Sequence, residues 1–339
     1  MKKTALLLSI VVMFILAACS GSNSSPADAE GVNENGEWTP SRSIEFVAPA
    51  GAGGGWDTTA RMLARVLEEE GIADQSFGVV NKPGGGGAVG WAYVHNRNDP
   101  HHVFVASPPL MFIPLNGQSE FGHEDFTPIA NLIADYGAFA VRADAKWENL
   151  SELFEDMVED PTSVSVIGTS SPGSMDHMQF VNFAEAAGVD ITQIRYVSEQ
   201  EGGTLTALLN GSVDVLSTGV SEAVEQARAG EIRILGITAP ERLEGEFLSE
   251  LPTGIEQGID AEFVNWRGVF GPPDMTPEQV KYFEDLFREA SESEAFAEIR
   301  NTYGWEEFFM GSEEYGQFLD EQKNEIQGLL ERLGFDVHE

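Results

Sequence analysis

The sequence predicts an α/β protein of two lobes, with a hinge and a ligand cleft between them. Three observations support this fold class. The chain has 339 residues, which is long for a single hydrophobic core. From residue 43 onward, short apolar runs alternate with helical patterns, which is typical of βαβ units and largely parallel sheets. Loops rich in glycine and serine follow several strands and open the next helix, at the edge where open sheets bind ligands.

Short apolar runs mark the expected strands, which lie at 43–49, 77–81, 103–107, 138–142, 163–168, 193–197, 213–217, 232–238 and 262–270. Helices are expected where apolar residues recur at spacings of three and four. In the first, over 58–70, Leu63 and Leu67 lie on the apolar face. Gly71 can end that helix. Further helices are expected at 88–96, 149–159, 174–187, 203–210 and 220–229.

The tail from 277 to 333 is expected to be helical. Its last helix has an apolar stripe of Leu319, Ile326, Leu330 and Leu333, which most simply packs on the first lobe. We expect lobe 1 to comprise residues 41–143 and 264–339, and lobe 2 residues 144–263. The chain then crosses between the lobes twice, and two crossings make a hinge.

The first residues have the pattern of a bacterial lipoprotein signal. Lys2 and Lys3 precede an apolar run over 5–18 that is too short to span a bilayer comfortably. Cys19 follows small residues and is the single cysteine, which excludes an intramolecular disulfide. We therefore expect a signal peptide over 1–19 with lipid on Cys19, and a flexible tether over 20–40. The globular part would then lie outside the cytoplasm, lipid-anchored to the outer face of the cell membrane or periplasmic.

The charge balance excludes several kinds of partner. Lys and Arg total 19 against 56 Asp and Glu, a formal charge of -37. Nucleic-acid binding needs a basic face, and binding to anionic lipid needs a polybasic patch. Neither is visible, so the acidic residues are interpreted as a solvated surface, and no nucleic-acid partner is expected.

Four loops could hold an anion: 49–59, 81–88, 168–177 and 217–222. Glycines present bare N–H groups, and the start of a helix adds about half a positive charge. Such loops suit a carboxylate. A nucleotide fingerprint fails because Trp56 stands where the third glycine belongs. For the first loop alone, a glycine-rich turn with Asp57 as a helix-start acid is an equally good interpretation.

Enzyme and metal hypotheses have little support. The run 219–223 is close to a nucleophile elbow, but only His338 follows Ser221 in the chain. Adjacent His101 and His102 would point to opposite sides of a strand, which argues against a shared metal. We expect no catalysis, no cofactor and no metal. A secreted serine hydrolase using Ser221 and a ligand-sensing co-receptor for a membrane kinase stay open as alternatives.

Seven motifs resemble the solute receptors of tripartite tricarboxylate transporters, the Bug or TctC family. In order they are PAGAGGGWDTTAR (49–61), NKPGGGGAVG (81–90), GSMDH (173–177), GGTLTALL (202–209), GSVDV (211–215), GVSE (219–222) and NWRGVF (265–270). The resemblance implies a type II periplasmic-binding-protein-like fold. It also implies closure on a carboxylate and delivery of that ligand to a large and a small transmembrane subunit of a transporter. We expect the ligand to be a small, citrate-like di- or tricarboxylate and the protein to be a monomer.

The resemblance places the binding site in the loops 53–58 and 170–177, where backbone amides and waters hold the carboxylate. Arg267 either takes a second carboxylate or forms a surface salt bridge. Trp56 and Trp266 are either cleft walls or core. The candidate ligand-binding residues are Gly53, Gly54, Gly55, Trp56, Asp57, Thr58, Gly86, Ser107, Ser170, Ser171, Gly173, Ser174, Met175, Asp176, His177, Thr218, Ser221, Trp266 and Arg267.

Overall fold

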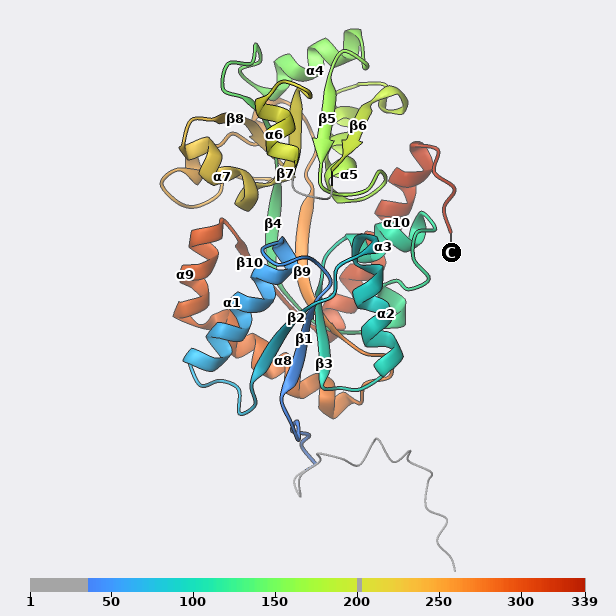
Figure 1. Cartoon of the computed structure of the whole chain (residues 1–339), viewed down its shortest axis with the longest axis vertical. Helices are drawn as coiled ribbons and strands as arrows, with labels where there is room; N and C mark the ends of the chain where they lie inside the picture. The colour runs from blue at the N-terminus through green and yellow to red at the C-terminus, as the bar shows by residue number, and fades with distance from the viewer. Residues whose placement is uncertain (1–35, 200–202, 339) are drawn as a thin grey trace, which may run out of the picture.

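A computed structural model describes residues 36–199 and 203–338 of the chain. The expected signal peptide, Cys19 and most of the expected tether lie outside the described residues. The molecule has two lobes stacked along its long axis, as Figure 1 shows. Among the described residues, we find no helix that combines the length and the apolar character needed to cross a bilayer.

Lobe 1 has a sheet covered by helices on both faces. Its elements are β1 (Ile44–Ala48), α1 (Gly55–Glu69), β2 (Phe77–Asn81), α2 (Ala88–Arg97), β3 (His102–Ala106), α3 (Pro109–Leu115), β9 (Val264–Gly271), α8 (Pro277–Glu292), α9 (Glu294–Tyr303), β10 (Glu306–Gly311) and α10 (Ser312–Arg332). Strands β2, β1 and β3 are parallel, as the βαβ pattern predicts. Strand β9 continues the sheet antiparallel to β3.

Lobe 2 repeats this plan with a smaller sheet. Its elements are α4 (Leu150–Glu159), β5 (Ser165–Gly168), α5 (Met175–Ala186), β6 (Arg195–Ser198), α6 (Thr204–Leu209), β7 (Val215–Gly219), α7 (Val220–Arg228) and β8 (Ile232–Ile237). Strand β5 lies between β6 and β7 and is parallel to both. The carboxyl ends of the parallel strands in the two lobes face each other across the middle of the molecule (Figure 1).

One strand, β4 (Thr127–Arg142), belongs to both lobes. Its first part pairs with β9 and β10, and its last part, from Gly137, pairs with β7 and β8. The sequence predicted only the last five residues of this strand, because the earlier part is broken by Pro128 and polar Asn131 and Asp135. Strands β4 and β9 together form the expected double connection. The lobe boundaries at 143 and 263 stay a prediction.

Three further predictions need correction. Helix α3 was not predicted, because two prolines mask its apolar PLMFIPL run, although proline is compatible with the first turn. The tail is not helical throughout, since β10 interrupts it and pairs with β4. Trp38, in the expected tether, is buried against Tyr282 and Phe283. The end of the tether therefore packs on lobe 1. Burial of the large apolar indole stabilises this packing.

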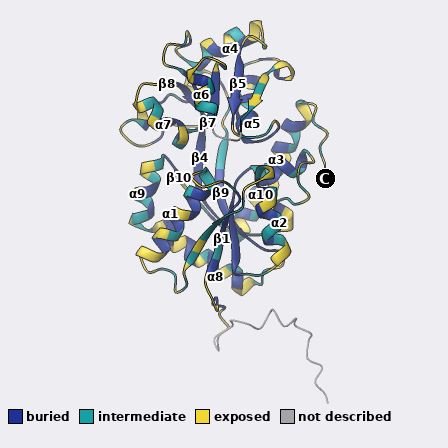
Figure 2. Ribbon diagram, in the orientation of Figure 1, coloured by how far each residue is buried: buried dark blue, intermediate teal, exposed yellow. Residues whose placement is uncertain are grey.

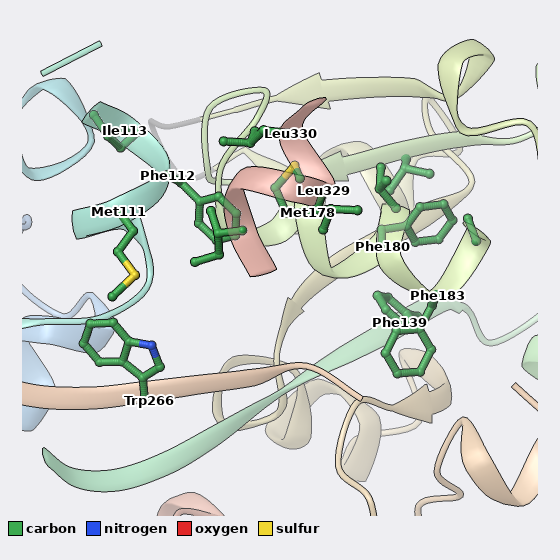
Figure 3. Packing of buried hydrophobic residues seen from close by; sticks show 14 of the residues in the cluster. Met111, Phe112, Ile113, Phe139, Met178, Phe180, Phe183, Trp266, Leu329 and Leu330 are labelled. Atoms are coloured by element: carbon green, nitrogen blue, oxygen red, sulfur yellow. The ribbon is translucent and has the colours of Figure 1, made fainter. Parts of the chain in front are cut away.

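The hydrophobic core runs from one lobe into the other, and Figure 2 shows buried residues following the sheet through both. Trp266 of β9 packs against Tyr315 of α10, with ring centroids 5.7 Å apart. The end of α10 does not stay on lobe 1 as predicted. Figure 3 draws Leu329 and Leu330 near Met178 of α5, and all three belong to one buried cluster.

The close contact between β9 and α10 predicts that adding one methyl group at Gly268 destabilises the protein. A Cβ atom added at Gly268 would lie 2.8 Å from the carbonyl oxygen of Ala130 and would also meet the Tyr315 ring. We expect Gly268→Ala to lower the free energy of unfolding by about 1–3 kcal/mol, because the buried backbone cannot move away.

Gly316→Ala is the matched control, since its Cβ would meet only Pro128, at 3.9 Å. It should raise the free energy of unfolding by up to about 1 kcal/mol, through helix propensity. Urea unfolding of the chain from Ser20 onward measures both effects. Equal urea midpoints for the two variants would contradict this packing.

Candidate functional site

A cleft of about 610 Å³ lies between the lobes, where the loops after the parallel strands converge. Lobe 1 lines it with residues 49–56, parts of 83–87 and Ser107. Lobe 2 lines it with 169–171, 174–176 and Gly219, and the connecting strands add Tyr136, Asn265 and Arg267. The predicted loops therefore gather at one place, as the sheet-edge rule requires.

The loop before α1 is fixed by Asp57. Its carboxylate accepts a hydrogen bond from the Gly53 amide at 2.8 Å and another from the Asn81 side chain at 2.8 Å. Arg61 adds an ion pair at 2.9 Å. Gly53 has φ +83°, a backbone conformation that favours glycine. Asp57 itself is buried and does not line the cleft, so it acts on the loop from behind.

The first turn of α1 leaves hydrogen-bond donors free. The helix begins at Gly55, so the glycine loop supplies its first residue. Within the described residues, the N–H groups of Gly55 and Trp56 make no hydrogen bond, as expected for a helix start. The Trp56 indole donates to the Ser107 hydroxyl at 2.9 Å, which holds this side chain as a wall of the cleft.

The loop before α5 is built in the same way around Asp176. This carboxylate accepts hydrogen bonds from the amides of Thr169 at 2.8 Å and Ser170 at 3.0 Å. The Ser170 hydroxyl in turn accepts a hydrogen bond from the Asp176 amide at 2.7 Å. Within the described part of the chain, the Met175 amide makes no hydrogen bond. Two helix starts, one from each lobe, thus meet at the cleft.

His177, one of the candidate ligand-binding residues, lies outside the cleft lining. Its Nδ1 accepts a hydrogen bond from the Gly173 amide at 2.9 Å, and the ring packs on Tyr196 outside the cleft lining. Burial lowers the pKa of His177 to about 4. The imidazole is therefore neutral near pH 7 and shapes the loop.

Arg267 is committed to protein partners. Its guanidinium forms a buried ion pair with Asp135 of β4, and it donates to the Gly55 carbonyl oxygen at 3.2 Å and to the Thr59 hydroxyl at 3.0 Å. The expected surface salt bridge is wrong, because Arg267 is only 4% exposed. The guanidinium borders the cleft, but it ties the start of α1 to the connecting strands.

The cleft carries more negative than positive side chains. Among the residues that line it, Arg267 is the single cation, whereas Asp176 and Glu222 are acids. Burial, together with the charge of Glu222, raises the pKa of Asp176 to about 6. Burial also raises the pKa of Asp135 to about 6, although Arg267 opposes the shift. An anion bound here would need donors other than free cationic side chains.

The structure divides the predicted site residues into two groups. The cleft is lined by Gly53, Gly54, Gly55, Trp56, Gly86, Ser107, Ser170, Ser171, Ser174, Met175, Asp176 and Arg267. The lining does not include Asp57, Thr58, Gly173, His177, Thr218, Ser221 and Trp266. Trp266 is fully buried in the core, so its interpretation as a cleft wall is wrong.

Ser221 lacks the surroundings of a nucleophile. Its hydroxyl lies 3.4 Å from the Asp135 carboxylate, and no described histidine contacts it. The sequence analysis missed Tyr136, Gln179 and Asn265, which also line the cleft. Asn265 could have been predicted, because residues two apart on a strand share one face and Asn265 lies two residues before Arg267 on β9.

A larger hollow of about 860 Å³ lies between the lobes on the other side of the connecting strands. It is lined by α10, by Asn182 and Glu185 of α5, and by β10, and its rim is strongly acidic. None of the predicted loops reaches it. The helix starts converge only on the smaller cleft, which is therefore the candidate functional site.

Comparisons with known proteins agree with this geometry. Residues 60–335 match the model of the tripartite tricarboxylate transporter family receptor. A UPF0065 protein of Bordetella pertussis is 25% identical over 342 residues, covering 98% of this chain and 99% of its own. A TctC solute-binding protein from Polaromonas is 26% identical, with a TM-score of 0.67, and the match covers 87% of this chain and 99% of that one.

MatC from Rhodopseudomonas palustris, solved with bound malate, has the same fold. It is 22% identical with a TM-score of 0.73, and the match covers 86% of this chain and all of that chain. A second R. palustris protein, solved with adipate, is 22% identical with a TM-score of 0.77. The match covers 88% of this chain and 98% of that one. The matched family is a receptor family and the Polaromonas neighbour is a solute-binding protein, so this chain is a receptor and not an enzyme.

Asp176 and Asp57, at the starts of α5 and α1, should change the free energy of unfolding in opposite directions as pH rises. The pKa of Asp176 is raised from 3.8 to about 6, so the native state holds its proton more tightly and the free energy of unfolding falls as pH rises through this range. Burial opposes a low pKa at Asp57, but Arg61, Gly53 and Asn81 outweigh it and lower the pKa. Its contribution is present above 3.8 and is lost in acid.

Urea unfolding as a function of pH tests this contrast. Relative to wild type, Asp176→Asn should gain stability between about pH 4 and pH 7, on the order of 2–3 kcal/mol. Relative to wild type, Asp57→Asn should lose stability as pH rises toward about 4 and should then stay level up to pH 7, because the pKa of Asp57 lies below 3.8 in the native state. Parallel pH profiles for the two variants would show that the aspartates do not differ in this way.

Proposed function

Because the chain belongs to the tripartite tricarboxylate transporter receptor family, we propose that it captures a small di- or tricarboxylate by closure of its lobes. It then delivers this anion to the large and small transmembrane subunits of a secondary transporter. A citrate-like acid is the expected class. The proposal adds two points to the family assignment: the kind of anion and the transporter as the partner.

The observation that carries the proposal is the pair of free helix starts in the cleft. The amides of Gly55 and Trp56 from lobe 1 and of Met175 from lobe 2 border a space of about 610 Å³. Hydrogen bonds from such donors to an ionised acceptor contribute roughly 1.5–3 kcal/mol each, and the helix dipoles add to them. A ligand with a carboxylate at each end could use both helix starts at once.

Side-chain hydroxyls supply further donors. Ser174, at the N-cap position of α5, lines the cleft and makes no capping hydrogen bond with its side chain. Its hydroxyl is therefore available to a ligand oxygen. Ser171, from the same loop, also lines the cleft. Neutral donors of this kind bind a carboxylate without bringing a cation into an acidic protein.

Closure of the lobes explains capture. The lobes already meet on both sides of the cleft. A Cβ added at Gly304 of lobe 1 would lie 3.0 Å from Leu248 of lobe 2, and one at Gly86 would lie 3.9 Å from the Ser171 hydroxyl. Donors from both lobes can hold one ligand only in this closed arrangement, so the ligand shifts the population toward it.

The ligands of the structural neighbours support the chemical class. The R. palustris proteins hold malate in one case and adipate in the other, and both are dicarboxylates. The cleft volume lies within the range of about 300–1,000 Å³ typical of small-molecule sites. We further propose that lipid on Cys19 and a tether over 20–35 keep the receptor close to its membrane subunits.

A thermal-shift panel followed by calorimetry tests the ligand class. The chain from Ser20 onward retains every described residue, and malate, adipate and citrate are suitable probes. We expect at least one of them to raise the melting temperature by several degrees at about 1 mM, because binding only to the native state stabilises it. Monocarboxylic acetate and neutral glycerol are controls. Equal shifts for glycerol and all the acids would reject the proposal.

Two substitutions test the assigned donors. Asp57→Ala should release the loop before α1, and Ser174→Ala should remove one hydroxyl donor. We expect each to weaken binding of the best acid in the panel by about tenfold, equivalent to roughly 1.4 kcal/mol. Both variants should remain folded by circular dichroism.

The matched controls are Asp190→Ala and Ser293→Ala, since Asp190 and Ser293 begin helices away from the cleft. They remove the same groups and should leave affinity unchanged. Wild-type affinity in Asp57→Ala and Ser174→Ala would reject both assignments. An equal loss in test and control variants would point to general destabilisation.

A further inference from the structure

Helix α10 and the residues after it connect the lobes a third time. The helix begins on lobe 1, where Tyr315 is buried against Trp266. It ends beside lobe 2, where the Arg332 guanidinium donates to the Glu185 carboxylate of α5 at 2.9 Å and 3.1 Å. Figure 1 shows the end of α10 beside α5, with the C-terminus returning toward α3.

The residues after α10 form one unit with the end of α3. The Phe335 amide donates to the Leu330 carbonyl oxygen at 3.1 Å, which turns the chain back toward lobe 1. The His338 amide donates to the Leu115 carbonyl oxygen at 2.8 Å. Leu115 is the last residue of α3, and Asn116 follows it directly. Asn116 is thus part of lobe 1, and the hydrogen bond of His338 ties the residues after Phe335 to the same lobe.

Asn116 and Phe335 both reach across to Gly173 of lobe 2. The Asn116 side-chain amide donates to the Gly173 carbonyl oxygen at 3.2 Å. A Cβ added at Gly173 would lie 2.9 Å from the Phe335 ring, so the ring packs directly on the bare Cα of this glycine. Gly173 has φ +78°. The position thus favours glycine for its backbone conformation and for this close approach.

Gly173 lies in the loop that presents the donors of α5. Its own amide is held by His177, within lobe 2, and the next residue is Ser174 of the cleft lining. Separation of the lobes would break the contacts with Asn116 and Phe335 and leave the contact with His177 intact. The contacts from lobe 1 therefore exist only while the lobes are closed.

We propose that Asn116 and Phe335 form an interlobe clasp on Gly173 that positions the lobe 2 donor loop and slows release of the bound anion. The inference rests on the proposed capture of a carboxylate by lobe closure and adds the residues that regulate it. The clasp stabilises the closed state, so losing it affects dissociation more than association. Asn116 and Phe335 are positioning residues, since neither lines the cleft.

Paired variants separate a clasp from ordinary packing. Asn116→Leu removes the donor to Gly173 and adds no charge. Its control is Asn324→Leu, because Asn324 also donates to a main-chain carbonyl oxygen, that of Asp320, but within α10. Phe335→Ala removes the ring. Its control is Phe309→Ala, where a partly buried ring of β10 packs within lobe 1.

Lobe separation is measured first, without any ligand. Spin labels at Glu70→Cys and Glu155→Cys report the distance between exposed positions of lobe 1 and lobe 2 in the chain from Ser20 onward. Both clasp variants should enlarge the open population relative to their controls. Unchanged distance distributions in both clasp variants would overturn the proposal. This readout does not depend on whether a carboxylate binds.

Stopped-flow binding of malate, adipate and citrate is measured second. For any acid that binds wild type, the clasp variants should raise the dissociation rate by about 5- to 10-fold and leave the association rate within about twofold. Dissociation rates equal to those of the controls would overturn the clasp while leaving the proposed function standing. If no carboxylate binds wild type, the proposed function fails, and the distance measurement alone decides whether the clasp exists.

Discussion

Two buried aspartates hold the loops on which the cleft depends. Asp57 accepts the Gly53 amide behind the start of α1, and Asp176 accepts the amides of Thr169 and Ser170 behind the start of α5. Each carboxylate uses loop amides next to the first helical turn. Within the described residues, the amides of Gly55, Trp56 and Met175 in these turns make no hydrogen bond, and all three residues line the cleft. Asp57 therefore lies behind its donors, outside the cleft lining, whereas the Asp176 carboxylate lines the cleft but is engaged by the loop amides.

This arrangement reconciles a formal charge of -37 with the binding of an anion. The field of the whole protein repels a carboxylate at long range, but it is screened within about 10 Å at ordinary ionic strength. Short hydrogen bonds in a closed cleft act at closer range. Arg267 contributes indirectly, because its ion pair with Asp135 fixes the connecting strands against the start of α1. The connecting strands β4 and β9 are therefore linked directly to the first residue of α1.

Much of this could be predicted from the sequence, because glycine and serine clusters after apolar runs mark loops at a sheet edge. The βαβ alternation gave most strands and helices to within a few residues. Contacts between residues far apart in the sequence could not be predicted in this way. Arg267 and Asp135 are 132 positions apart, and the sequence does not show whether an arginine already has an acidic partner in the protein. The contact of Phe335 with Gly173 was missed for the same reason. Trp266 was ambiguous because cleft walls and cores use the same residue types.

The most direct test is a crystal structure with the carboxylate that binds best. The account predicts one carboxylate group within about 2.7–3.1 Å of the amides of Gly55 and Trp56, with a second group or a water near the Met175 amide. The buried pair between Arg267 and Asp135 should remain intact in that complex. A carboxylate paired with the Arg267 guanidinium, or bound in the acidic hollow behind the connecting strands, would contradict the central claim.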